Sequence, residues 1–167
     1  EMSRGLGDVY KRQVVLKAAK LLFPRRYAWM FTALVVFLPG NVILYSYVNC
    51  DALAMCSTAI IFYSWVKAYK EGWNWTTCAV SAIGMGLCFL SYYNAYGFIL
   101  TTFFFFVGTM LTDQEKAPKE RWKEMIQKGL FILVIVCVIA LWWFIRNAIL
   151  YHGDFLGRET SLSLIHI

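Results

Sequence analysis

Two long apolar runs, at positions 27–48 and 130–145, constrain this chain more than any other feature, and neither holds a charged residue. About 20 apolar residues in a helix are enough to cross the roughly 30 Å hydrocarbon core of a membrane. The chain of 167 residues is 60% hydrophobic and 16% charged, whereas soluble domains average about 25% charged. A soluble core of this size could not bury such runs, so the sequence predicts an all-α, polytopic transmembrane helical bundle.

Turn residues and charges divide the chain into about five predicted spans. The span over 27–48 contains Pro39 and Gly40 near its middle, which predicts a kink because proline removes a backbone hydrogen bond. A separate amphipathic surface helix is expected to begin at Pro118. Two short runs in the middle of the chain are interpreted as a closely turned helical pair, with one continuous helix as the alternative. The predicted spans are 27–48, 52–69, 76–91, 97–111 and 129–151.

Both ends of the chain resemble translated sequencing-adapter peptides. The similarity lies at 1–13 (EMSRGLGDVYKRQ) and at 162–167 (LSLIHI). We therefore expect 14–161 to be a transmembrane helical fragment of a larger protein, and we exclude both non-native ends from the fold prediction. Within that fragment, Val14–Phe23 is either an amphipathic piece at the membrane surface or the end of an upstream span.

The distribution of lysine and arginine predicts the orientation of the spans. Eleven of these residues fall on one side, including five at 112–128, and only Arg146 and Arg158 fall on the other. Basic loops stay in the cytoplasm, so we expect an integral protein of the bacterial cytoplasmic membrane with its basic loops inside. A single helix over 76–111 would spoil this asymmetry, and two helices are therefore preferred. The turns that would share the extracytoplasmic face are 49–51, 91–96 and 146–159.

Polar residues of these three turns are the candidate site residues. Asp51 begins a span, where its carboxylate either caps the helix, worth about 1 kcal/mol, or contacts an anion, a metal or a sugar; the two roles are compatible. Arg146 follows a tryptophan pair and either extends toward the membrane surface or binds a phosphate through its guanidinium group. The candidates for contact with substrate or lipid phosphate are Arg146, Asn147, Asn49, Tyr92, Tyr93 and Asp154.

Several of these residues have an ordinary structural explanation as well. Tyr92 and Tyr93 either stack on sugar rings or mark the membrane interface. His152 and Asp154 either form a turn or act as a proton-transfer or metal-binding pair. The five cysteines show no metal-ligand spacing, no cofactor motif is evident, and nothing in the sequence supports a divalent metal. The basic residues lie on membrane-proximal loops, so the expected partner is the lipid bilayer and not a nucleic acid.

Three short motifs, in this order, resemble one enzyme family. Pro39 and Gly40 followed by YVNCDALA at 47–54 are similar to a "vNxDal" turn. A glycine-rich helix at 83–91 leads into an aromatic turn. WWFIRN at 142–147, followed by YHGDFLG at 151–157, looks like the pattern "WxxRNxxxYGDxLG". The family is that of the polytopic C-type fold (GT-C) glycosyltransferases, which are related to protein O-mannosyltransferases and the lipid A aminoarabinose transferase.

The resemblance covers about 28–157 and implies transfer of a sugar from a polyprenyl-phosphate donor at the extracytoplasmic face. The catalytic acid of the family usually lies in a first external loop, upstream of this chain. Asp51 is therefore expected to support the site, and the fragment is expected to be inactive alone. The family often has a lysine for the lipid phosphate where this sequence has Tyr92, which leaves Arg146 as the candidate.

The alternative is a non-enzymatic polytopic membrane protein that handles lipid or polymer, or a fragment of a transporter. Ion- or proton-coupled transporters carry ionisable residues inside their spans. None of the predicted spans has one at its centre, which counts against the transporter.

Overall fold

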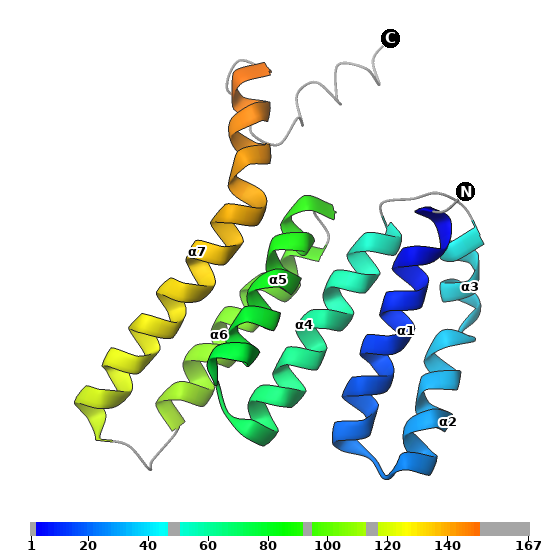
Figure 1. Cartoon of the computed structure of the whole chain (residues 1–167), viewed down its shortest axis with the longest axis horizontal. Helices are drawn as coiled ribbons and strands as arrows, with labels where there is room; N and C mark the ends of the chain where they lie inside the picture. The colour runs from blue at the N-terminus through cyan, green and yellow to red at the C-terminus, as the bar shows by residue number, and fades with distance from the viewer. Residues whose placement is uncertain (1–2, 47–50, 92–94, 113–116, 151–167) are drawn as a thin grey trace.

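The computed structural model describes residues 3–46, 51–91, 95–112 and 117–150, and every extended element in these ranges is an α-helix. The prediction of an all-α chain is confirmed. In Figure 1 the chain runs down α1, up through α2 and α3, down α4, up α5, down α6 and up α7. The helices are α1 (Ser3–Leu22), α2 (Arg25–Val36), α3 (Pro39–Ser46), α4 (Asp51–Glu71), α5 (Trp75–Ser91), α6 (Tyr96–Thr112) and α7 (Pro118–Leu150).

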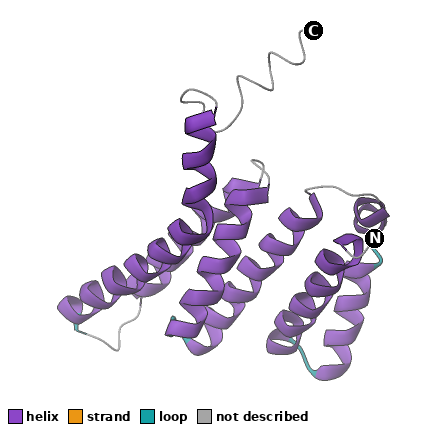
Figure 2. Ribbon diagram, turned by 45° about the horizontal axis from the view of Figure 1, so that its top comes forward, coloured by secondary structure: helices purple, strands orange, loops and turns teal. Residues whose placement is uncertain are grey.

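The packing is built around α5. This helix contacts α4 on one side and α7 on the other, while α1 packs against the far side of α4 and against α2. The remaining long helix, α6, touches α4, α5 and α7. At its C-terminal end α7 extends beyond the other helices (Figure 1). Figure 2 shows the same helices from a second direction, with no strand among the described residues.

The first predicted span is not one helix. The span over 27–48 was predicted as one helix kinked at Pro39, but the structure has two helices there, because α2 ends at Val36 and α3 begins at Pro39. Proline lacks the N–H that would bond the carbonyl four residues earlier, and its ring clashes with that carbonyl. It suits the first position of a helix, where no such bond is needed. The break therefore falls immediately before Pro39, and α2 and α3 have 12 and 8 residues, about 18 and 12 Å.

The carbonyl that Pro39 leaves without its helical partner finds another donor. In a continuous helix, a backbone N–H at position 39 would donate to the oxygen of Val35, but proline has none. The Asn41 Nδ2 donates to that oxygen instead, at 2.5 Å. The Oδ1 of the same amide accepts a hydrogen bond from Lys11 Nζ at 3.1 Å. Both Asn41 and Lys11 are buried. Asn41 thus links the broken end of α2 to α1, a role that the apolar pattern of 27–48 did not predict.

The last predicted span is longer than expected. The separate amphipathic helix from Pro118 and the span over 129–151 form one helix, α7, of 33 residues, about 50 Å long. After Pro118, the one residue in α7 that strongly disfavours a helix is Gly129. It destabilises the helix by only about 1 kcal/mol relative to alanine, which is too little to end it. Lys128 pairs with Glu124 one turn earlier, so the charged segment continues into the apolar one without a break.

The central pair of predicted helices is present. α5 and α6 are separate helices of 17 residues each, at the lower limit of the roughly 17–25 residues needed to cross a membrane. By length and composition, α4 and α7 are the two helices, among the described residues, that are long and apolar enough to cross one.

Small side chains fill the interior of the bundle and large apolar side chains face outward. Phe37, Leu34, Val138 and Ile149 are each more than 70% exposed. Small residues at helix contacts with large apolar residues outside are typical of helices surrounded by lipid. Among the described residues, the largest fully buried side chains are Ile61, Thr77, Thr102, Cys78, Cys88, Ser57, Ser64 and Ser81.

Two glycines allow α5 to approach its neighbours closely. A Cβ on Gly84 would lie 2.9 Å from Ile61 Cγ1 and 3.2 Å from the backbone nitrogen of Ile61, on α4. A Cβ on Gly86 would lie 2.9 Å from Ile139 Cβ, on α7. The two positions therefore serve opposite sides of α5.

A single asparagine caps α5. The Oδ1 of Asn74 accepts hydrogen bonds from the Thr77 backbone N–H at 2.8 Å and from the hydroxyls of Thr76 and Thr77. We expect Asn74→Ala to lower the free energy of unfolding by about 1 kcal/mol, because a backbone N–H loses its partner. Asn74→Asp keeps the acceptor and opposes the positive end of the helix, so it should retain stability. Titration with SDS in detergent micelles measures both, and equal losses would contradict the capping role.

Candidate functional site

Asp51 lies at the end of the bundle where the predicted site was expected. It is the first residue of α4 and half-buried. A carboxylate in the first turn interacts favourably with the positive end of the helix dipole. The start of α4, the end of α5, the start of α6 and the end of α7 all lie at this end (Figure 1).

Arg146 and Asn147 are neighbours in sequence but face different surroundings. The side chain of Arg146 is exposed, and its guanidinium carbon lies 5.4 Å from the centre of the Trp143 ring. This contact is within the range of a cation–π interaction. Asn147, about 100° further around α7, is only 7% exposed. The arginine is thus available to a ligand from outside, while the asparagine amide belongs to the interior.

Arg146 also lines a shallow depression on the surface of α7. Its walls are otherwise apolar, and its volume is about 520 Å³. A single guanidinium in an apolar surround, held over an aromatic ring, is suited to an anionic group next to a hydrocarbon chain. The depression is lined by Trp142, Ile145, Arg146, Ile149 and Leu150.

The described residues do not form one compact site. Asp51 and Arg146 lie toward the same end of the bundle, but α5 separates α4 from α7 (Figure 1). Among the described residues no group of three or more His, Cys, Asp or Glu could hold a metal ion. The other candidates, Asn49, Tyr92, Tyr93 and Asp154, lie outside the described residues.

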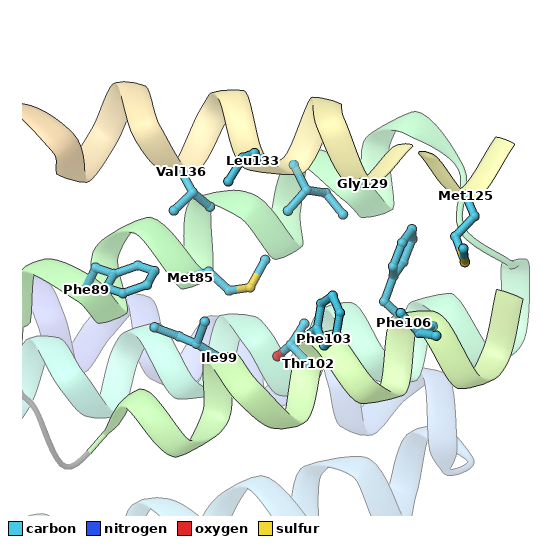
Figure 3. Close-up of a pocket in the computed structure, with 12 residues that line it drawn as sticks. Met85, Phe89, Ile99, Thr102, Phe103, Phe106, Met125, Gly129, Leu133 and Val136 are labelled. Carbon is cyan, nitrogen blue, oxygen red and sulfur yellow. The ribbon is translucent and has the colours of Figure 1, made fainter. Parts of the chain in front are cut away.

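A cavity that sequence patterns did not predict lies between α5, α6 and α7. Its volume is about 480 Å³. Figure 3 shows Met85 and Phe89 of α5 behind it, with side chains of α6 and α7 on either side. Among the described residues that line the cavity, Thr102 alone has a polar side chain. The cavity therefore has the apolar walls of a site for a hydrophobic ligand.

Two hydrogen bonds between tryptophan and threonine hold α6 in place beside this cavity. Trp65 Nε1 donates to Thr102 Oγ1 at 3.1 Å, and Trp73 Nε1 donates to Thr109 Oγ1 at 2.7 Å. Each threonine hydroxyl in turn donates to a carbonyl one helical turn earlier. Thr102 and Thr109 are seven residues apart and so share a face of α6. This spacing was the one sequence signal that could have identified the contact.

The opposite end of the bundle carries basic side chains near the cavity. Lys128 Nζ and Glu124 Oε1 are 2.5 Å apart, and Lys128 is buried. One turn before Met125, Arg121 Nη1 donates to the carbonyl of Leu111 at the end of α6. This contact ties the start of α7 to the end of α6.

Comparison with protein-family models, with curated proteins and with solved structures found no match to this chain. The class that the fold defines is an all-helical chain in which two of the described helices are long and apolar enough to cross a membrane.

Proposed function

We propose that this chain is a fragment of a GT-C glycosyltransferase of the membrane, about five spans in extent. The enzyme would transfer a sugar from a polyprenyl-phosphate donor at the extracytoplasmic face. Support for the membrane location comes from α4 and α7, which are long and apolar enough to cross, and from large apolar side chains on the outside of the bundle. The break at Pro39 and the 17-residue α5 and α6 imply that several spans are short or interrupted.

The observation that carries the proposal is the shared position of four helix ends. The start of α4, the end of α5, the start of α6 and the end of α7 lie at one end of the bundle (Figure 1). These are the helix ends next to the three motifs that resemble the family. Basic residues such as Arg25, Lys70 and Lys119 lie at helix ends on the opposite side, which agrees with a cytoplasmic location for that end.

The proposed mechanism is an inverting displacement at the C1 atom of the sugar. A carboxylate upstream of this chain would act as the base and take the proton of the acceptor hydroxyl. The bond from C1 to the phosphate oxygen breaks as the new glycosidic bond forms, and Arg146 would neutralise the charge that develops on the leaving phosphate. Because α5 separates α4 from α7, Asp51 and Arg146 would contact different parts of the substrates.

The test uses the full-length protein and measures sugar transfer from a polyprenyl-phosphate donor. We expect Arg146→Ala to lower kcat/KM about tenfold or more, because hydrogen bonds to charged groups contribute roughly 1.5–3 kcal/mol. Arg146→Lys keeps the charge but loses the bidentate geometry, so it should recover part of the rate. Asp51→Asn should have a smaller effect, as a supporting carboxylate.

Matched controls lie at the other end of the same bundle. Arg26→Ala removes an exposed arginine, and Glu71→Gln removes a carboxylate at the far end of α4. Both should leave transfer unchanged. Normal transfer by Asp51→Asn and Arg146→Ala would remove these residues from the mechanism. A full-length sequence with no acidic residue in its first external loop would favour the non-enzymatic membrane protein instead.

A further inference from the structure

We propose that the cavity between α5, α6 and α7 binds one hydrocarbon chain of an anionic phospholipid, whose head group lies at the basic first turns of α7. The proposal rests on the membrane location of the bundle but not on sugar transfer. Three observations support it: the chemistry of the walls, the size of the cavity and the charge at one of its ends.

The walls are suited to hydrocarbon. Eleven of the twelve lining residues have apolar side chains or none, and the exception, Thr102, uses its hydroxyl in two hydrogen bonds within the protein. Phe106 and Met85, which are mostly buried, form part of the walls. Leu133, on the α7 side, is 56% exposed. The cavity therefore opens outward, where a lipid chain could enter from the side.

The size of the cavity excludes a helix and fits a single chain. The lining residues of α7 extend from Met125 to Val136, which is about 16 Å along the helix axis. A helix of that length with its side chains is about 10–12 Å wide and would occupy about 1,300–1,800 Å³. The volume of the cavity is only about 480 Å³. An additional helix could cover the opening but could not fill it.

The charge near one end of the cavity selects the head group. Met125 and Gly129 mark that end (Figure 3), and α7 begins there at Pro118. Residues 118–128 contain four basic side chains and two acidic ones. Lys128 is engaged by Glu124, whereas Lys119 and Lys123 are exposed. A net positive cluster at a membrane surface attracts anionic lipid. Lys119 and Lys123 lie about 9 and 3 Å along the helix axis from Met125, which is within reach of a head group whose chain enters through the opening beside Leu133.

The test counts phospholipids that stay bound to the full-length protein. The protein is purified in mild detergent, exposed to phosphatidylglycerol or phosphatidylcholine vesicles, and examined by native mass spectrometry. We expect at least fivefold more phosphatidylglycerol than phosphatidylcholine to be retained. Val136→Phe, which fills the cavity, should lower retention at least fivefold. Val138→Phe makes the same change at a side chain that is 73% exposed and should have no effect.

Two further variants keep the test decisive. Leu133→Phe fills the cavity from an exposed position, and it replaces Val136→Phe if circular dichroism shows that the latter has lost helix. Lys119→Gln combined with Lys123→Gln should reduce the preference for phosphatidylglycerol to less than twofold, while some lipid is still retained.

Three results would overturn the proposal. Equal retention by the Val136 and Val138 variants would show that lipid covers the surface without entering the cavity. Equal retention of the two phospholipids by the unaltered chain would exclude the head-group site. Displacement of phosphatidylglycerol by an equimolar polyprenyl phosphate would assign the cavity to the sugar donor. None of these readouts involves sugar transfer, so each is distinguishable from a failure of the proposed enzyme.

Discussion

Replacing Gly84 by valine is expected to lower the free energy of unfolding by about 1–3 kcal/mol, the usual cost of overpacking a tight contact. An added Cβ would lie 2.9 Å from Ile61 Cγ1 and 3.2 Å from the Ile61 backbone nitrogen. The side chain of Ile61 could rotate, but its backbone belongs to α4 and could move only with the whole helix. The substitution should therefore separate α4 from α5, and SDS titration in detergent micelles would measure the loss.

The matched control is Gly108→Val on α6. No atom lies within 4 Å of a Cβ built on Gly108, and valine has a better helix propensity than glycine. The control should be neutral or stabilising by a few tenths of a kcal/mol. Equal losses at Gly84 and Gly108 would show that the close approach of α4 and α5 does not govern stability.

Some of this architecture could be predicted from sequence because it depends on local composition. The span predicted at 52–69 is α4, Asp51–Glu71, and the helical pair predicted at 76–91 and 97–111 is α5 and α6. Apolar runs between polar turns, with Lys67 near the end of the first run, define these helices to within two residues. The decision for two helices depended on charge asymmetry, and the structure has two helices there.

Other features depend on contacts between segments and could not be predicted in this way. Pro39 was expected to kink a helix, but it ends one, and Asn41 supplies the hydrogen bond to Val35 that makes the break tolerable. A single asparagine hardly lowers the mean hydropathy of a long apolar run, so hydropathy alone does not reveal the role of Asn41. The charged segment before Gly129 was expected to be separate, but the pairing of Lys128 with Glu124 allows α7 to run through it.

The candidate site shows the same limit. Sequence grouped Arg146 with Asn147 because they are adjacent, whereas a helix turns about 100° between them and leaves one exposed and the other buried. The cavity beside α6 was missed because its walls come from three helices, and apolar residues there looked like ordinary spans. Its position becomes apparent only once α6 and α7 are placed against α5.

Replacing Trp73 by alanine is expected to lower the free energy of unfolding by about 3–5 kcal/mol, the usual cost of removing a buried aromatic side chain. Trp73 is 6% exposed, its ring lies 4.9 Å from the ring of Phe106 edge-on, and its Nε1 donates to Thr109 Oγ1. It lies in the turn between α4 and α5 and contacts α6, so its loss removes packing from three helices. Trp122→Ala removes a tryptophan that is 54% exposed and should cost much less.

Two further variants separate the hydrogen bond of Trp73 from its packing. Trp73→Phe keeps most of the ring contact with Phe106 but loses the N–H donor, and Thr109→Val removes the acceptor. Hydrogen bonds between membrane helices average about 0.6 kcal/mol, so the coupling energy of the double-mutant cycle should be near that value. Packing would then supply most of the loss in Trp73→Ala. A coupling energy close to the full effect of Trp73→Ala would reverse this assignment and make the hydrogen bond the main link between the turn and α6.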